Sequence, residues 1–294
     1  MKLEKLHIKT ALQKVTSRYP YQYSLDPYRG CAHHCEYCYA IYTQKYLGEK
    51  DFFDTIYVKE NILEVLENEL RSPKWKHQVV AIGTVCDAYQ PIEAELKLMP
   101  AILKLMIKYR TPVVISTKSD LILRDFDLIK ELASITYVNI AETITCCEDS
   151  LGKMIEPNAA PSSRRFHVLE KFKQTNATVG LHVMPIIPLI NDYKQNIEGL
   201  YRIAANIKVD YVLNGTLYLR GSTRSSFMNF FKRYDHKHYE EFIQLYHNGV
   251  LDKQYKIALY SWIKPLMKQY HLSSDYMSIS KDKFPKAIEQ LSLF

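Results

Sequence analysis

The sequence predicts an α/β fold in which parallel strands are joined by helices. Short apolar runs of strand length alternate with stretches whose apolar residues recur at helical spacing. Polar residues directly follow several of these runs, and parallel α/β folds place their active sites at the carboxyl ends of their strands. The composition, 47% hydrophobic and 24% charged, is that of an ordinary globular chain. These patterns do not choose between an open doubly wound sheet and a barrel.

Six strands are expected along the 294 residues. The candidate strands cover residues 21–26, 78–82, 112–115, 137–141, 179–184 and 211–219. The candidate helices cover residues 61–71, 102–107, 125–133, 161–174 and 193–207. In the first of these helices Ile62, Leu66 and Leu70 fall on one face, and Pro161 is suited to begin the fourth. Strand and helix therefore alternate up to about residue 219.

No internal repeat or low-complexity linker divides the chain, so we expect one core with two appendages. Residues 1–20 carry an excess of basic side chains and are expected to form a solvated N-terminal arm. Residues 21–219 are expected to form the core. Residues 220–294 are expected to pack on this core as a helical extension.

Three cysteines, Cys31, Cys35 and Cys38, lie within eight residues of one loop. The neighbouring Pro27 and Gly30 allow the sharp turn that three converging thiolates require. A closed zinc site or a common iron–sulfur cluster takes four ligands, so the spacing Cys-x3-Cys-x2-Cys leaves one metal position open. On a four-iron, four-sulfur cluster that open position can bind a substrate or cofactor directly.

The same loop contains His33 and His34, and a zinc knuckle completed by one of them is the alternative interpretation. Zinc sites more often combine a Cys-x2-Cys pair with a distant second pair, which favours the iron–sulfur cluster. A histidine in a loop is usually solvated or hydrogen-bonded. Neither histidine is therefore predicted to be a ligand.

The remaining cysteines indicate the compartment. Six cysteines in 294 residues are too few for a disulfide-stapled fold, which fits a reducing compartment. The adjacent Cys146 and Cys147 are expected to pack rather than bind a metal. The N-terminus lacks a signal-peptide pattern, and no apolar run approaches the roughly 20 residues that span a bilayer. We therefore expect a cytoplasmic protein with no membrane partner.

The cysteine loop resembles the cluster motif of the radical S-adenosylmethionine (SAM) enzymes, with Tyr37 directly before the third cysteine. The residues flanking the cysteines resemble the spore photoproduct lyase-like branch of that superfamily. The resemblance extends from about residue 26 to residue 192. It includes residues 84–93, 117–119 with 124–125, 156–157 with 161 and 164–165, and 184–188 with 191–192.

This resemblance implies a fold, a cofactor and a reaction class. The fold would be a partial (β/α)6, TIM-like barrel of parallel strands with a C-terminal helical extension. Cys31, Cys35 and Cys38 would hold a [4Fe–4S] cluster whose open iron binds the amino and carboxylate groups of SAM. An electron from a donor such as flavodoxin or ferredoxin would then cleave SAM into methionine and a 5′-deoxyadenosyl radical. The protein would be an enzyme, a lyase or another catalyst of radical chemistry.

The resemblance also suggests the residues that hold SAM. Lys118, at a strand end, is expected to pair with the SAM carboxylate, with the Thr143 hydroxyl beside it. Tyr37 and Ile187 are expected to contact the adenine. Each expectation has a plain structural alternative, which is solvent exposure for Lys118 and packing for Tyr37 and Ile187.

One position departs from the family pattern. Spore photoproduct lyase uses a cysteine of the second-strand loop as a hydrogen-atom donor, and the corresponding position here is Thr84. Cys86 lies in the same loop and is the candidate catalytic residue. Because the cysteine is displaced, repair of the spore photoproduct is not carried over to this chain.

The substrate is the least constrained feature. The net charge of +7 and the tract 220–237, in which basic residues alternate with Phe227, Phe230, Phe231 and Tyr234, favour nucleic acid. Basic groups neutralise phosphates and aromatic rings stack on bases. An amphipathic surface helix with a basic outer face is the simpler interpretation of the tract. A peptide or small metabolite is the alternative substrate, and a zinc-binding interaction module is the alternative to an enzyme.

Overall fold

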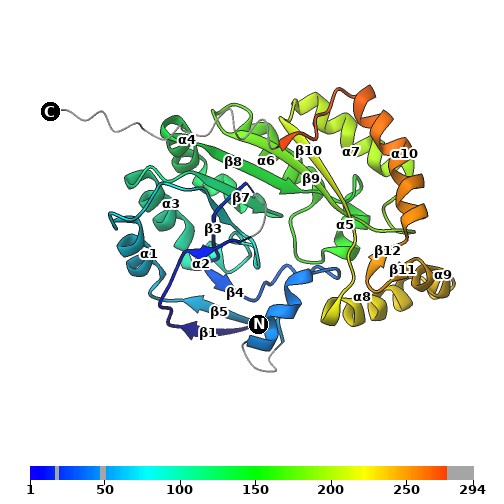
Figure 1. The fold of residues 1–294 in the computed structure, drawn as a ribbon, viewed down its shortest axis with the longest axis horizontal. Helices are drawn as coiled ribbons and strands as arrows, with labels where there is room; N and C mark the ends of the chain where they lie inside the picture. Colours follow the sequence, from blue (N-terminus) through cyan, green and yellow to red (C-terminus); the bar gives the residue numbers. More distant parts are fainter. Residues whose placement is uncertain (17–19, 47–50, 277–294) are drawn as a thin grey trace.

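The computed structural model describes residues 1–16, 20–46 and 51–276, and Figure 1 shows a twisted central sheet with helices packed along it. The sheet has seven strands in the order β10-β9-β8-β7-β6-β3-β2. They are β10 (Tyr211–Thr216), β9 (Thr178–Ile186), β8 (Val138–Thr143), β7 (Val113–Thr117), β6 (Val80–Ile82), β3 (Tyr23–Leu25) and β2 (Gln13–Lys14).

Six of these strands are parallel, and each neighbours the next one along the chain within the sheet. A doubly wound sheet would instead reverse its strand order at a switch point. The sheet ends at β10 on one edge and at β2, antiparallel to β3, on the other. The fold is therefore the wall of a (β/α)6 barrel that does not close across the described strands, which confirms the predicted fold class.

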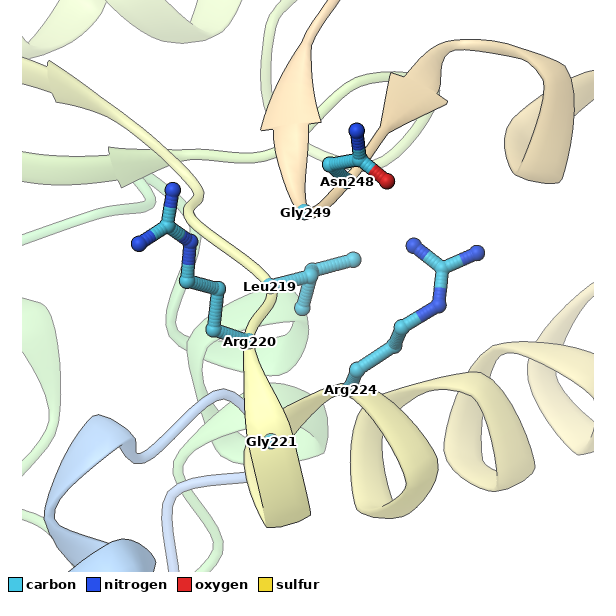
Figure 2. A pocket seen from close by; sticks show the side chains of 6 residues that line it. All are labelled: Leu219, Arg220, Gly221, Arg224, Asn248 and Gly249. Carbon is cyan, nitrogen blue, oxygen red and sulfur yellow. The ribbon is translucent and has the colours of Figure 1, made fainter.

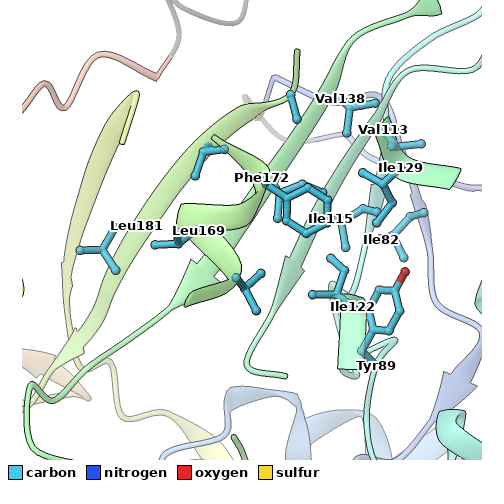
Figure 3. Packing of buried hydrophobic residues seen from close by; sticks show 14 of the residues in the cluster. Ile82, Tyr89, Val113, Ile115, Ile122, Ile129, Val138, Leu169, Phe172 and Leu181 are labelled. Atoms are coloured by element: carbon cyan, nitrogen blue, oxygen red, sulfur yellow. The ribbon is translucent and has the colours of Figure 1, made fainter. Parts of the chain in front are cut away.

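The connecting helices form because their apolar residues recur at helical spacing and find a common core. The main ones are α1 (Ile62–Leu70), α3 (Leu98–Lys108), α4 (Phe126–Ile135), α6 (Ser162–Phe172) and α7 (Lys194–Ile207). Shorter segments are α2 (Glu93–Leu96), α5 (Asp149–Ile155) and the 3-10 helices η1 (Tyr39–Tyr46) and η2 (Asp120–Asp125). In Figure 3, Phe172 of α6 and Ile129 of α4 pack against Ile115 of β7 and Val138 of β8.

The N-terminal segment does more than the solvated arm that we expected. Strand β1 (Lys2–Leu6) runs parallel to β5 (Thr55–Lys59), and β4 (Tyr28–Arg29) completes this smaller sheet on the other side of β5. Ala11 and Leu12 are buried, and their amides donate hydrogen bonds to the Glu69 carboxylate of α1. The basic side chains of this segment could not predict the pairing, because β1 joins β5 through backbone hydrogen bonds.

The C-terminal extension consists mainly of helices, as expected, although residues 277–294 lie outside the described range. It contains α8 (Gly221–Tyr234), α9 (Tyr239–Gln244) and α10 (Lys253–Gln269), with a hairpin of β11 (Tyr246–His247) and β12 (Val250–Leu251) between the last two. In Figure 1, α10 lies beside α7, and α8 lies below the ends of the sheet strands. Among the described helices, none is both long and apolar enough to cross a bilayer.

Candidate active site

The cysteine loop begins where β3 and β4 deliver the chain to one end of the sheet. Gly30 adopts φ +81°, and a Cβ there would lie 2.3 Å from the Thr55 carbonyl oxygen, so this turn requires glycine. Cys31 and Cys35 are buried, and Cys38 is half-buried. The amide of Cys38 donates to the Cys35 carbonyl at 3.0 Å. The expected sharp turn before the cysteines is confirmed.

Side chains from distant parts of the chain anchor this loop. Gln90 accepts a hydrogen bond from the Ala32 amide at 2.9 Å and donates one to the Gly30 carbonyl at 3.2 Å. Asn158 donates to the Ala32 carbonyl at 2.9 Å. From α8, the Thr223 hydroxyl donates to the Cys38 carbonyl at 3.2 Å. The loop is therefore held by the loops after β6 and α5 and by the C-terminal extension.

His33, within the cysteine loop, is buried rather than solvated. Its Nδ1 atom lies 3.3 Å from Oδ2 of Asp87, which follows β6. Asp87 also accepts hydrogen bonds from the Thr117 hydroxyl and from the Lys118 amide, both at 2.8 Å. Burial raises the pKa of the Cys31 thiol, but a hydrogen bond from His33 and the charge of His33 outweigh burial and leave that pKa below its ordinary value. His33 thus favours the thiolate form of Cys31.

A second network joins the loop to the ends of β7 and β8. The Tyr37 hydroxyl donates to the buried Glu156 carboxylate, and Nη1 of Arg165 lies 2.6 Å from the other Glu156 oxygen. Burial raises the pKa of Glu156, but the charges of Arg165 and Lys118 outweigh burial and hold it below the usual value. The Lys118 ammonium lies 5.8 Å from the centre of the Tyr37 ring. Arg165 also donates to the Thr143 carbonyl at 2.7 Å.

The residues that the resemblance suggested for SAM are brought to one end of the sheet. Lys118 is half-buried and follows β7, while Thr143 is the last residue of β8. Ile187 is fully buried and packs in the same apolar cluster as Cys35 and Tyr37. Lys118 remains partly accessible to solvent, so its solvent-exposed alternative is not contradicted. The cofactor role of these four residues stays a prediction.

Cys86 lies in a closed environment. It is buried with Cys31 in an apolar cluster, and its thiol donates to the Tyr28 carbonyl at 3.3 Å. The Asp26 carboxylate accepts hydrogen bonds from the Thr84 amide and hydroxyl, and its Oδ1 atom lies 3.8 Å from the Cys86 sulfur. Burial, with the charge of Asp26, raises the pKa of the Cys86 thiol well above its ordinary value. The sulfur is therefore a neutral thiol near the cysteine loop, and its catalytic role stays a prediction.

The basic tract after β10 corrects one expectation. Phe227, Phe230 and Phe231 are buried in the apolar cluster that α8 forms with α9 and the cysteine loop, so they are not available to stack on bases. Their spacing forms the buried face of an amphipathic helix, not an exposed surface of interleaved aromatic and basic residues. The simpler interpretation of the tract is therefore correct for α8.

The remaining cysteines behave as packing residues. Cys146 is fully buried, and Cys147 is half-buried with its sulfur against Gly199 of α7. Among the described residues, no group of three or more His, Cys, Asp or Glu side chains is already arranged around a single metal ion. The metal-ligand role of Cys31, Cys35 and Cys38 stays a prediction.

Sequence reasoning missed three polar groups at this end of the sheet, two of them buried and His182 half-buried. Glu142 of β8 is fully buried, and neither of its carboxylate oxygens has a hydrogen-bond partner among the described residues. Burial raises its pKa well above the usual range. His182 of β9 and Arg165 of α6 were also given no role. A charged residue inside a run of strand or helix residues was the available signal for Glu142 and Arg165.

Comparison with known proteins agrees with this geometry. The sequence model of the Radical SAM superfamily matches residues 25–200. An uncharacterized protein of Mycobacterium tuberculosis is 33% identical over 275 residues, which cover 91% of this chain and 81% of the relative. An uncharacterized protein of Methanocaldococcus jannaschii is 30% identical over 248 residues, covering 83% of this chain and 86% of the relative.

Solved structures of spore photoproduct lyase have the same fold. One variant of that enzyme superposes with a TM-score of 0.67 at 14% identity, covering 91% of this chain and 79% of the lyase. A complex of the lyase with a dinucleoside spore photoproduct gives a TM-score of 0.65 at 14% identity over the same shares. With the family match over residues 25–200, the chain belongs to the radical SAM superfamily, is a radical SAM enzyme, and has the fold of spore photoproduct lyase.

Proposed function

We propose that Cys31, Cys35 and Cys38 hold a [4Fe–4S] cluster that leaves one iron free for SAM. The observation that carries this proposal is the position of the three thiols in one anchored loop at the carboxyl ends of parallel strands. Three thiolates match the donor set of such a cluster with one ligand missing. The His33 contact favours the anionic form of Cys31, which a ligand requires.

We further propose that SAM lies over the ends of β7, β8 and β9. Lys118, whose ammonium faces the Tyr37 ring, would bind the SAM carboxylate, and the Thr143 hydroxyl would assist it. Ile187 and Tyr37 would flank the adenine with apolar surface. When bound, the reduced cluster supplies the electron that cleaves SAM to methionine and a 5′-deoxyadenosyl radical. The protein residues orient SAM and exclude water around it.

The substrate that the observations favour is nucleic acid. The chain carries a net charge of +7, which suits a polyanion, and spore photoproduct lyase has been solved with a dinucleoside lesion bound. Cys86 is proposed as a hydrogen-atom donor, because its neutral thiol lies in the apolar cluster that contains Cys31. Flavodoxin or ferredoxin would supply the electron.

Anaerobic reconstitution with iron and sulfide tests this function. The account predicts an oxygen-sensitive iron–sulfur chromophore, and 5′-deoxyadenosine from SAM after reduction by dithionite or flavodoxin. Protein that retains one tight zinc ion, takes up no cluster and forms no 5′-deoxyadenosine would instead be a zinc-binding interaction module. If SAM is cleaved but no nucleic acid stimulates the reaction, the substrate is a peptide or small metabolite.

A further inference from the structure

We propose that a single strand of nucleic acid binds across a surface next to the cysteine loop. This surface, the tyrosine–arginine surface, consists of Tyr39, Tyr42 and Lys45 of η1, of Tyr218 and Arg220 between β10 and α8, and of Arg224 in the first turn of α8. The proposal rests on the proposed function, because it names the form of nucleic acid that would reach the radical site. It is carried by exposed rings, a cavity with arginine side chains, and a direct link to the loop.

The exposed side of η1 is aromatic and basic. A 3-10 helix has three residues per turn, so residues 39, 42 and 45 lie above one another on one face. Tyr39 and Tyr42 are 59% and 46% exposed, and Lys45 is also exposed, whereas Ala40, Ile41 and Thr43 between them are buried. Exposed rings in a row on one face of a helix form a platform on which successive bases can stack.

A cavity of about 350 Å³ lies where β10 leads into α8. Leu219, Arg220, Gly221, Arg224, Asn248 and Gly249 line it. In Figure 2, Arg224 extends from the first turn of α8 toward Asn248, while Arg220 projects from the other side of the connecting segment. Neither arginine forms an ion pair with a carboxylate among the residues described.

The positive charges of these two arginines at the cavity therefore have no carboxylate counter-ion in the described part of the chain. The Arg220 guanidinium lies 4.8 Å from the centre of the Tyr218 ring, which is 46% exposed. An arginine stacked on an exposed tyrosine presents its donors outward beside an aromatic face. Phosphate oxygens accept from such a fork, and a base can lie on the adjacent ring.

The two halves of the surface meet at the cysteine loop. Thr223 lies between Arg220 and Arg224 in α8, and its hydroxyl is 3.2 Å from the Cys38 carbonyl and 3.4 Å from the Tyr39 carbonyl. Tyr39 directly follows Cys38, so the stacking platform begins one residue after the third cysteine. A strand that follows this surface would therefore pass beside the proposed cluster.

The geometry favours a single strand over a duplex. Bases can stack on tyrosine rings only when they are not stacked in a double helix. The buried phenylalanines of α8 leave the tyrosines of η1 and Tyr218 as the exposed aromatic groups here. Duplex nucleic acid would offer phosphates to the arginines but no free base to the rings.

The test compares variants of the anaerobically reconstituted full-length protein. Binding of a fluorescent single-stranded oligothymidylate, a duplex of equal length and inorganic phosphate is measured across a range of salt concentrations. Arg220→Ala/Arg224→Ala is expected to weaken strand binding at least about 10-fold and to reduce the salt slope by about 1.4. The matched control is Lys104→Ala/Lys130→Ala, on α3 and α4 at the far side of the molecule, which should change neither quantity.

Variants of Tyr42 test whether bases stack on the tyrosines of η1. Tyr42→Ala is expected to weaken binding of the single strand by about 5- to 100-fold, whereas Tyr42→Phe, which keeps the ring, should bind like the parent protein. Binding of inorganic phosphate should be unaffected in both. Tighter binding of the duplex, unchanged strand binding in the arginine variant, or equal loss in both Tyr42 variants would overturn the proposal.

Cleavage of SAM by dithionite, without any oligonucleotide, separates this proposal from the proposed function. We expect all these variants to form 5′-deoxyadenosine at the parent rate, since none of the changed residues is a proposed ligand. If the parent protein binds the strand through these residues but never cleaves SAM, the surface stands and the proposed function fails. If it cleaves SAM but binds no strand, the surface fails and the function stands.

Discussion

The hydroxyl of Tyr37 donates a hydrogen bond to the Glu156 carboxylate, although the two residues are 119 positions apart in the sequence. Tyr37 lies between the second and third cysteines of the loop, and Glu156 directly follows α5. Glu156 in turn faces Arg165, which holds the carbonyl of Thr143 at the end of β8. One buried carboxylate therefore ties the cysteine loop to the strand ends.

Breaking this buried ion pair is expected to cost stability. Glu156 and Arg165 are each 1% exposed, so Arg165→Ala should lower the free energy of unfolding by about 3–5 kcal/mol in urea denaturation. The neighbouring Arg164 is 68% exposed and pairs with Asp120 at the surface, so Arg164→Ala should cost less than about 1 kcal/mol. Adding Glu156→Gln to Arg165→Ala should recover part of the loss. Equal losses of unfolding free energy in the two single variants would show that the buried ion pair stabilises the fold no more than the exposed one does.

Gly30 is expected to be irreplaceable in the turn before Cys31. In Gly30→Ala the new Cβ would meet the carbonyl oxygens of Thr55 at 2.3 Å and Phe52 at 2.9 Å, and φ is +81°. Gly221 also has a positive φ, +54°, but no atom lies within 4 Å of its Cβ position. Gly221→Ala should therefore cost only the backbone strain, about 1–2 kcal/mol, and Gly30→Ala should cost clearly more. Thermal unfolding of both variants checks this order.

His182 gives the protein a stability that depends on pH. Burial, with the nearby charge of Lys118, lowers the pKa of His182 to about 4, compared with about 6.5 in the unfolded chain. A lowered pKa means that stability is fully present above pH 6.5 and is lost as the pH falls toward 4. For His182 alone the loss is about 2 kcal/mol at pH 5. Urea unfolding of metal-free His182→Gln should lack this component.

The matched control for that experiment is His167→Gln on the exposed face of α6, which should keep the parent pH dependence. Equal loss of stability between pH 7 and pH 5 in the parent protein and in His182→Gln would show that His182 does not supply this component. The same conclusion would follow if both glutamine variants behaved alike.

Cys86→Ala is expected to separate radical generation from product formation. Cys86 is not one of the proposed cluster ligands, so reductive cleavage of SAM should continue at the parent rate. If this thiol donates a hydrogen atom, product formation should fail with a nucleic acid fraction of cell extract that stimulates 5′-deoxyadenosine formation by the parent enzyme. Mass spectrometry of that fraction makes the comparison, with Cys147→Ala as control. A parent yield of product from Cys86→Ala would leave Cys86 a packing residue.

Most of the architecture could be predicted from the sequence because it follows from local pattern. The runs that became β7, β8 and β9 and the helices α1 and α4 are encoded by apolar spacing and by strand-ending polar residues. The smaller sheet could not be predicted, since β1 and β4 are short and their pairing with β5 depends on backbone contacts across the chain. The same limit applies to the β11–β12 hairpin.

The site was predictable where spacing alone carries the chemistry. Three cysteines in one loop could be recognised without a fold, and Lys118 followed a strand. The partnership of His33 with Asp87 and that of Tyr37 with Glu156 could not, because each joins residues that only folding brings together. The exposed tyrosines of η1 were missed because burial, not composition, distinguishes them from the phenylalanines of α8.

Formation of 5′-deoxyadenosine by cysteine variants tests the central claim most directly. Cys31→Ala, Cys35→Ala and Cys38→Ala should each lose the iron–sulfur chromophore and SAM cleavage, because two thiolates do not retain the cluster. Cys146→Ala, at a buried cysteine outside the loop, should keep both. Measured anaerobically with dithionite, loss in the three loop variants alone is the predicted result. Retained SAM cleavage in any loop variant, or equal loss in all four, would contradict the account.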